Sequence, residues 1–122
     1  MKKTILVIED NEQNLYLVTF ILEKHGYHVE AAQDGQEGIT LATRMRPDLI
    51  LLDVQLPVMD GYEATRRIKA NAELKAIPVI AVTSYALSGD EAKARAAGCD
   101  AYVAKPFSPR QLLAKVREYL PS

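Results

Sequence analysis

The sequence predicts an α/β domain built on a doubly wound, five-stranded parallel sheet in the order 2-1-3-4-5. Short apolar runs alternate five times with longer segments of helical character, which is typical of consecutive β/α units. The apolar runs are rich in Val, Ile and Leu, as expected for strands that helices cover on both faces. Right-handed crossovers then leave few topologies, and this strand order is the natural candidate.

The central strand is the clearest element. The apolar residues from Leu49 to Leu52 lie between two helix breakers, Pro47 and Pro57, and are too few for a helix. Asp53 follows them directly. A lone Asp often begins a surface turn. An unpaired buried carboxylate is costly, however, so a charge at the end of a buried strand also suggests that the strand surfaces at a functional site.

The elements before the central strand follow from capping signals. Gly26 is a preferred C-cap residue, and Glu37 follows Asp34 by three residues in a capping-box pattern. Arg46 precedes a proline and therefore avoids helical geometry. We expect strands over 4–8 and 28–32, and helices over about 12–25 and 35–46.

The elements after the central strand are marked in the same way. Asp60 with Glu63 repeats the capping pattern, Gly98 ends a helix, and Ser108 with Pro109 supplies an N-cap and a proline at the first helical position. We expect strands over 78–82 and 101–104, and helices over about 61–71, 90–97 and 109–120.

Composition limits the classes of function. The 122 residues suit one domain, expected to span 1–122 with no output domain. The formal net charge of −1 gives no basic field for nucleic acid or for an anionic membrane. The first apolar run is too short for a signal peptide, and the single Cys99, expected to be buried, fits a reducing compartment. We therefore expect a cytoplasmic protein that binds neither nucleic acid nor membrane directly.

Polar residues follow four of the five predicted strands. In a doubly wound sheet, ligands bind beyond the carboxyl ends of the strands, where the strand order reverses. Each residue alone has an ordinary explanation as a helix cap, a strand end or a surface lysine. Together they occupy the same end of neighbouring strands and predict one site, made of Glu9, Asp10, Asp53, Thr83-Ser84 and Lys105-Pro106.

The chemistry of this set suggests a metal and a phosphoryl group. Three adjacent carboxylates need compensation, and oxygen ligands with no His or Cys favour Mg²⁺ or Mn²⁺ over zinc. Lys105 could neutralise phosphate oxygens, and Thr83 could donate a hydrogen bond to one of them. Asp53, on the middle strand, is best placed to act as a nucleophile and form an aspartyl phosphate.

The same residues, with the segment 57–61 after the central Asp, resemble the receiver domain of two-component response regulators, the CheY-like superfamily, over residues 3–120. The resemblance implies a flavodoxin-like (βα)5 three-layer sandwich. It implies that Asp53 accepts a phosphoryl group from a histidine kinase or a histidine phosphotransfer protein. Mg²⁺ would be bound by Asp10, Asp53 and the backbone carbonyl of Gln55, with Glu9 contributing through water.

The resemblance assigns roles to the remaining residues as well. Lys105 and the backbone of Ser84 would contact the phosphoryl group, and the Lys105–Pro106 peptide would be cis. Thr83 and Tyr102 match the pair that switches conformation, although a half-exposed aromatic packed on a strand is an ordinary alternative for Tyr102. The face made by the fourth helix, fifth strand and fifth helix would then bind a downstream protein target.

Several functional alternatives remain. The chain resembles stand-alone receivers of the DivK type, acting as a monomer or weak homodimer, but also receivers from hybrid histidine kinases. A small Mg²⁺-dependent aspartyl phosphatase is disfavoured because Gln55 stands two residues after Asp53, where such an enzyme needs an acid/base. The complete set of site residues disfavours a phosphate-independent pseudo-receiver, and no Gly-rich loop for a nucleotide follows the first strand.

The first helix carries two faces of interest. Helical periodicity predicts a sheet-facing stripe of Asn14, Leu17, Val18, Ile21 and Leu22. Tyr16 and Phe20 then fall on the outward face, with Leu15 at its margin. Exposed aromatic residues beside an acidic site predict a docking patch for a helical phosphodonor, although scattered surface apolar residues are common.

Overall fold

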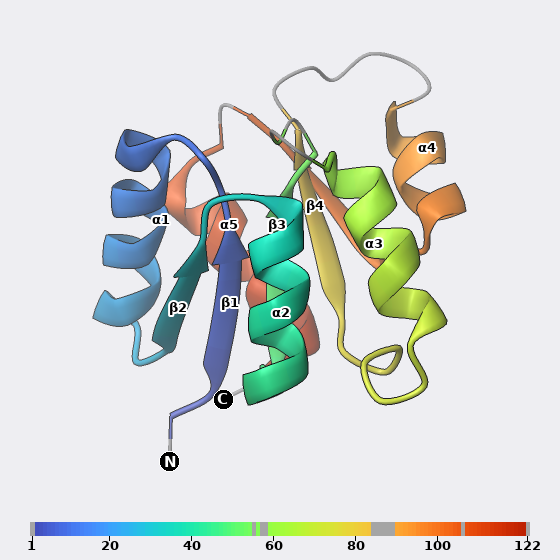
Figure 1. Cartoon of the computed structure of the whole chain (residues 1–122). Helices are drawn as coiled ribbons and strands as arrows, with labels where there is room; N and C mark the ends of the chain where they lie inside the picture. Colours follow the sequence, from blue (N-terminus) through green and yellow to red (C-terminus); the bar gives the residue numbers. More distant parts are fainter. Residues whose placement is uncertain (1, 55, 57–58, 84–89, 106, 122) are drawn as a thin grey trace.

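The structure is a computed structural model that describes residues 2–54, 56, 59–83, 90–105 and 107–121. It contains a five-stranded, all-parallel sheet in the order β2-β1-β3-β4-β5, which confirms the predicted topology (Figure 1). The strands are β1 (Thr4–Ile8), β2 (His28–Ala32), β3 (Leu49–Asp53), β4 (Val79–Thr83) and β5 (Ala101–Ala104).

Helices cover both faces of the sheet, and each helical layer closes its own core. The helices are α1 (Glu12–Lys24), α2 (Gly35–Met45), α3 (Gly61–Ala70), α4 (Asp90–Ala97) and α5 (Pro109–Tyr119). Alternation along β1 sends Ile5 and Val7 into the core under α1 and α5, and Leu6 and Ile8 into the core under α2, α3 and α4. Every residue of β3 is buried, as its position in the middle of the sheet requires.

Most element ends lie where the capping signals placed them. The side chain of Asp60 accepts the Glu63 backbone N–H at 2.9 Å and caps the start of α3. Arg46 has a left-handed φ of 47° and ends α2 before proline. β4 begins at Val79, one residue later than predicted, because Pro78 has no N–H for the ladder.

The outward face of α1 differs from the prediction in one respect. Val18, Ile21 and Leu22 are buried and face the sheet as expected, but Leu17 is 52% exposed. At 100° per residue, Leu17 lies about 100° from the centre of the buried stripe and beside the outward pair. Tyr16 and Phe20 are 74% and 55% exposed. We call Tyr16, Leu17 and Phe20 the α1 patch.

Leu15 does not belong to the α1 patch, because it is partly buried and packs against the core beneath α1 and α5. Among the described residues, no helix combines the length and apolar character that a membrane span needs.

Candidate functional site

The carboxyl edge of the sheet brings three acidic side chains together. β1 and β3 are hydrogen-bonded neighbours with Ile8 opposite Leu52, so the residues that follow them emerge side by side. One carboxylate oxygen from each of Glu9, Asp10 and Asp53 lies within 4.8 Å of the others. Glu9 and Asp53 are buried, whereas Asp10 is exposed. The edge therefore carries a compact, oxygen-lined acidic cluster.

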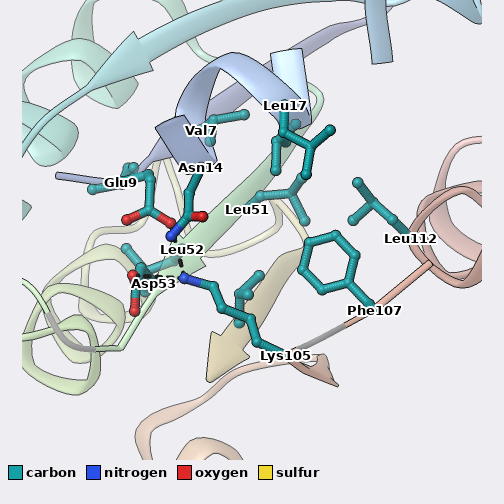
Figure 2. A pocket seen from close by; sticks show the side chains of 13 residues that line it. Val7, Glu9, Asn14, Leu17, Leu51, Leu52, Asp53, Lys105, Phe107 and Leu112 are labelled. Carbon is teal, nitrogen blue, oxygen red and sulfur yellow. Dashed lines mark hydrogen bonds and ion pairs between the residues drawn. The ribbon is translucent and has the colours of Figure 1, made fainter. Parts of the chain in front are cut away.

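Lys105 reaches this cluster from the end of β5. Its Nζ lies 3.0 Å from Glu9 Oε1 and 3.2 Å from Asp53 Oδ2 (Figure 2). The ammonium therefore bridges carboxylates at the ends of two different strands. The sequence predicted that these residues would meet, but it did not predict the direct Glu9–Lys105 ion pair.

Burial and like charge act on the carboxyl of Glu9. Its burial, its hydrogen bond with Asp53 and the charge of Asp53 raise the pKa of Glu9, and the contacts with Lys105 and the Asn11 N–H only partly oppose this. Burial alone would lower the pKa of Lys105, but the hydrogen bond to Glu9 and the charge of Asp53 outweigh burial and raise that pKa. The site thus keeps its ammonium charged and resists full ionisation of its carboxyls.

Thr83 and Tyr102 lie on the adjacent strands β4 and β5. Thr83 ends β4 and is almost fully buried, and its carbonyl accepts the Lys105 N–H at 2.6 Å. Tyr102, on β5, is half-buried and packs against the core under α2, α3 and α4. Three other residues that the sequence analysis assigned to the site lie outside the described residues, namely Gln55, Ser84 and Pro106.

Gly61 is a positioning residue, which the sequence analysis noted in a capping pattern and in the segment 57–61. A Cβ at this position would lie 2.5 Å from Val54 Cα and 2.6 Å from the Asp53 carbonyl oxygen. The Gly61 N–H donates to the Val54 carbonyl at 3.0 Å, so α3 begins in contact with the backbone that carries Asp53. A glycine at the first helical position after Asp60 was the available signal.

The donor set fits a hard divalent cation. The three carboxylates offer oxygen ligands, and within the described site one ammonium opposes three potential negative charges. No His or Cys side chain belongs to this cluster, so it lacks the nitrogen and sulfur ligands typical of zinc. Asp10 and Asp53, with Glu9 beside them, would hold such a cation at the edge of the sheet.

Comparison with known proteins assigns the family. The family described as "Response regulator receiver domain" matches residues 5–117. The chain belongs to the response regulator receiver family.

Receiver relatives match the chain over nearly its whole length. It is 43% identical to the polar-differentiation response regulator DivK of Brucella anthropi and 42% identical to DivK of Brucella ovis. Each alignment spans 120 residues and covers 98% of both chains. The chain is thus a DivK-like receiver of two-component signalling with an acidic cluster at its site.

Solved receiver structures share the fold. The receiver domain of sensor histidine kinase PA1611 from Pseudomonas aeruginosa PAO1, which holds a magnesium ion in its active-site cleft, superimposes with a TM-score of 0.93 at 38% identity. That alignment covers 100% of both chains. Chemotaxis protein CheY4 of Vibrio cholerae gives a TM-score of 0.92 at 28% identity, over 98% of this chain and 99% of CheY4. These similarities confirm the predicted CheY-like, flavodoxin-like architecture.

Proposed function

We propose that this receiver accepts a phosphoryl group on Asp53 in a Mg²⁺-dependent reaction and thereby switches its binding to a protein target. The observation that carries the proposal is the acidic cluster with Lys105 between Glu9 and Asp53. In this role the chain is a signalling module and does not turn over an external substrate.

Asp53 is the proposed phosphoacceptor. Its carboxylate oxygen attacks phosphorus and forms the O–P bond while the P–N bond of a donor phosphohistidine breaks, leaving the electron pair on the imidazole nitrogen. Asp10, Asp53 and the Gln55 carbonyl would hold the cation, with Glu9 acting through water, and Mg²⁺ (or Mn²⁺) held there would supply positive charge to phosphoryl oxygens. Lys105, already 3.2 Å from Asp53, supplies a second positive charge to the same oxygens.

Thr83 and Tyr102 are the proposed switch. The buried Thr83 hydroxyl lies on the strand next to Asp53, since Val82 of β4 is in register with Asp53 of β3. Thr83 and the backbone of Ser84 would hydrogen-bond the new phosphoryl oxygens, and Tyr102 would follow by turning inward. The surface of α4, β5 and α5 would change with them and select the downstream target.

The α1 patch is the proposed docking surface for a helical phosphodonor, either a histidine kinase or a histidine phosphotransfer protein. Its support is three large apolar side chains that are more than half exposed on the helix following Glu9 and Asp10. We expect Tyr16→Ala with Phe20→Ala to slow phosphotransfer from such a protein at least tenfold. Phosphorylation of the same variant by acetyl phosphate should stay at the wild-type rate, and an equal loss with both donors would refute docking.

We further propose that the chain acts as a DivK-like regulator in the cytoplasm, as a monomer or weak homodimer. Its 42–43% identity to the DivK relatives supports the DivK-like role. A receiver domain from a hybrid kinase is the second candidate, favoured by the 38% identity to the PA1611 receiver domain. Both candidates use the same chemistry at Asp53.

The decisive experiment is intact-mass spectrometry after incubation with acetyl phosphate. Wild type should gain one phosphoryl group with Mg²⁺ and none with EDTA, and Asp53→Asn should gain none. Asp60→Asn is the matched control, because Asp60 is a nearby acidic helix cap outside the cluster, and it should be phosphorylated. An adduct on Asp53→Asn, or no adduct together with no binding of beryllofluoride to wild type, would contradict the proposal.

A further inference from the structure

Asn14 is a polar residue on the sheet-facing side of α1. Helical periodicity places it on one stripe with Val18, Ile21 and Leu22, which are buried, and Asn14 itself is partly buried. Asparagine is a poorer helix former than leucine, and its carboxamide loses hydrogen bonds to water when it is covered. A polar side chain where an apolar one would pack better is the kind of local conflict that is expected at functional positions.

The side chain of Asn14 lines a cavity of about 390 Å³ that ends at the acidic cluster. Figure 2 shows its carboxamide directed toward the end of the cavity where Glu9, Asp53 and Lys105 meet. Of the thirteen described residues that line the cavity, only Lys105 and Asn14 have side chains with N–H groups. No hydrogen bond joins the Asn14 carboxamide to the other residues drawn there. The site thus holds a second, neutral donor that these residues do not engage in this structure.

Glu9 is the group that can use this donor. Its buried side chain accepts from Lys105 Nζ at 3.0 Å through Oε1 and from the Asn11 N–H at 3.2 Å through Oε2. The Asn14 N–H donates in turn to Asn11 Oδ1 at 2.9 Å, so hydrogen bonds fix the first turn of α1 beside Glu9. If Lys105 moves away, Glu9 Oε1 loses the ammonium, and a buried carboxylate oxygen without a donor is costly.

We propose that Asn14 is a positioning residue whose carboxamide donates to Glu9 Oε1 when Lys105 turns toward a phosphoryl group on Asp53. The inference rests on the proposed phosphorylation of Asp53, because the added negative charge would draw the ammonium toward the phosphoryl oxygens. An amide suits this exchange because it can donate to a carboxylate but forms a weaker hydrogen bond than an ammonium does. Lys105 therefore holds Glu9 before phosphorylation, and Asn14 holds it afterwards.

A double-mutant cycle in urea tests this exchange without Mg²⁺ or a phosphodonor. Lys105→Met removes the ammonium and thus imitates its departure from Glu9. In the wild-type background, Asn14→Leu should leave the unfolding equilibrium constant unchanged or slightly lower it, because Leu suits the apolar stripe. In the Lys105→Met background, Asn14→Leu should raise that constant about tenfold, the effect of losing a hydrogen bond to a charged group. Equal effects of Asn14→Leu in the two backgrounds would overturn the proposal.

Gln13→Leu is the matched control for this cycle. Gln13 lies on the same turn of α1, is exposed and does not line the cavity, so its substitution should have the same effect in both backgrounds. Coupling of Gln13→Leu to Lys105→Met as strong as that of Asn14→Leu would show that the cycle reports a general weakening of α1, and this too would overturn the proposal.

The side-chain NH₂ resonances of Asn14 provide a second measurement that needs only stable single variants. They are assigned by their absence from Asn14→Leu, and one proton should move downfield in Lys105→Met and in wild type that has bound Mg²⁺ and beryllofluoride. Unchanged resonances in either case would refute the exchange. Failure of wild type to bind beryllofluoride would instead count against the proposed function, because the urea cycle measures the contact between Asn14 and Glu9 independently of phosphorylation.

Discussion

Removing the ammonium of Lys105 is the sharpest perturbation that the site offers. Lys105→Met keeps an apolar stem of similar length but leaves Glu9 and Asp53, both buried, without the cation that lies 3.0 and 3.2 Å from their oxygens. We therefore expect Lys105→Met to lower the free energy of unfolding substantially in metal-free buffer.

Two estimates bound the expected loss in the free energy of unfolding of Lys105→Met. Removing one partner of a buried ion pair typically costs about 3–5 kcal/mol. The folded variant can avoid the full cost by protonating Glu9, and protonating a carboxyl with an ordinary pKa of about 4.3 at pH 7 costs about 3.7 kcal/mol. We expect the free energy of unfolding to fall by about 3 kcal/mol at pH 7. This is near the lower end of the range for buried ion pairs, because the Lys105 side chain is 19% exposed.

The loss of stability in Lys105→Met should depend on pH, because Glu9 can take up a proton. The folded-state pKa of Glu9 is raised above 4.5, so its contribution to stability is fully present below pH 4.5 and is lost as pH rises through the folded pKa. Losing Lys105 raises the folded-state pKa of Glu9 further, so the variant loses stability over a wider pH range than wild type. The difference between the two should shrink from pH 7 to pH 5 by up to about 1.4 kcal/mol per pH unit.

Urea unfolding at pH 5, 6 and 7 with EDTA, repeated at pH 7 with Mg²⁺, measures these quantities. Lys69→Met is the matched control, because the Lys69 side chain is also 19% exposed and donates to Asp100 Oδ2 at 2.9 Å. Asp100 lies just before β5, at the opposite end of the strand from Lys105, so Mg²⁺ should recover stability in Lys105→Met and not in the control. A loss below about 1 kcal/mol at pH 7, or an equal loss at pH 5 and 7, would refute the reasoning.

Three further predictions follow from backbone geometry and burial. Gly61→Ala should destabilise the fold by about 2 kcal/mol or more in urea unfolding, because its Cβ meets Val54 Cα at 2.5 Å; a loss near zero would show that α3 shifts freely. Ser108→Ala should cost about 1 kcal/mol by removing the cap that accepts the Gln111 N–H at 3.1 Å, and Ser108→Asp should retain most of that stability. Burial raises the pKa of the Cys99 thiol, so alkylation at pH 8 should be at least about tenfold slower in the folded protein than in urea, and equal rates would contradict its burial.

The sheet and its acidic edge could be predicted because simple rules determine them. A five-residue strand buried on both faces needs an unbroken apolar run, and the run from Leu49 supplies it between two prolines. Parallel strands end at the same edge, so residues that follow them gather there whatever their distance in sequence. Glu9 and Lys105 are 96 residues apart, yet Lys105 Nζ and Glu9 Oε1 lie within 3.0 Å.

Other features depend on tertiary packing, which helical periodicity alone does not predict. Leu17 and Leu15 lie on opposite margins of the buried stripe of α1, and the position of neighbouring elements decides which margin is covered. Leu15 packs against the core, and Leu17 remains exposed. Likewise, the sequence predicted that Lys105 lies beside Asp53, but its pairing with Glu9 depends on the length and direction of the side chains beyond the strand ends.

The charge balance of the edge explains why so few residues would be enough for the proposed switch. Burial and Asp53 raise the pKa of Glu9, so the edge is under electrostatic strain when its carboxyls ionise without a cation. A divalent ion would remove that strain, whereas a phosphoryl group on Asp53, as proposed, would add negative charge and draw Lys105 away from Glu9. The bridge from Lys105 joins the end of β5, which also carries Tyr102, to the ends of β1 and β3. In the proposed function, a change in charge at Asp53 would therefore be transmitted directly to the strand beneath the proposed target-binding face.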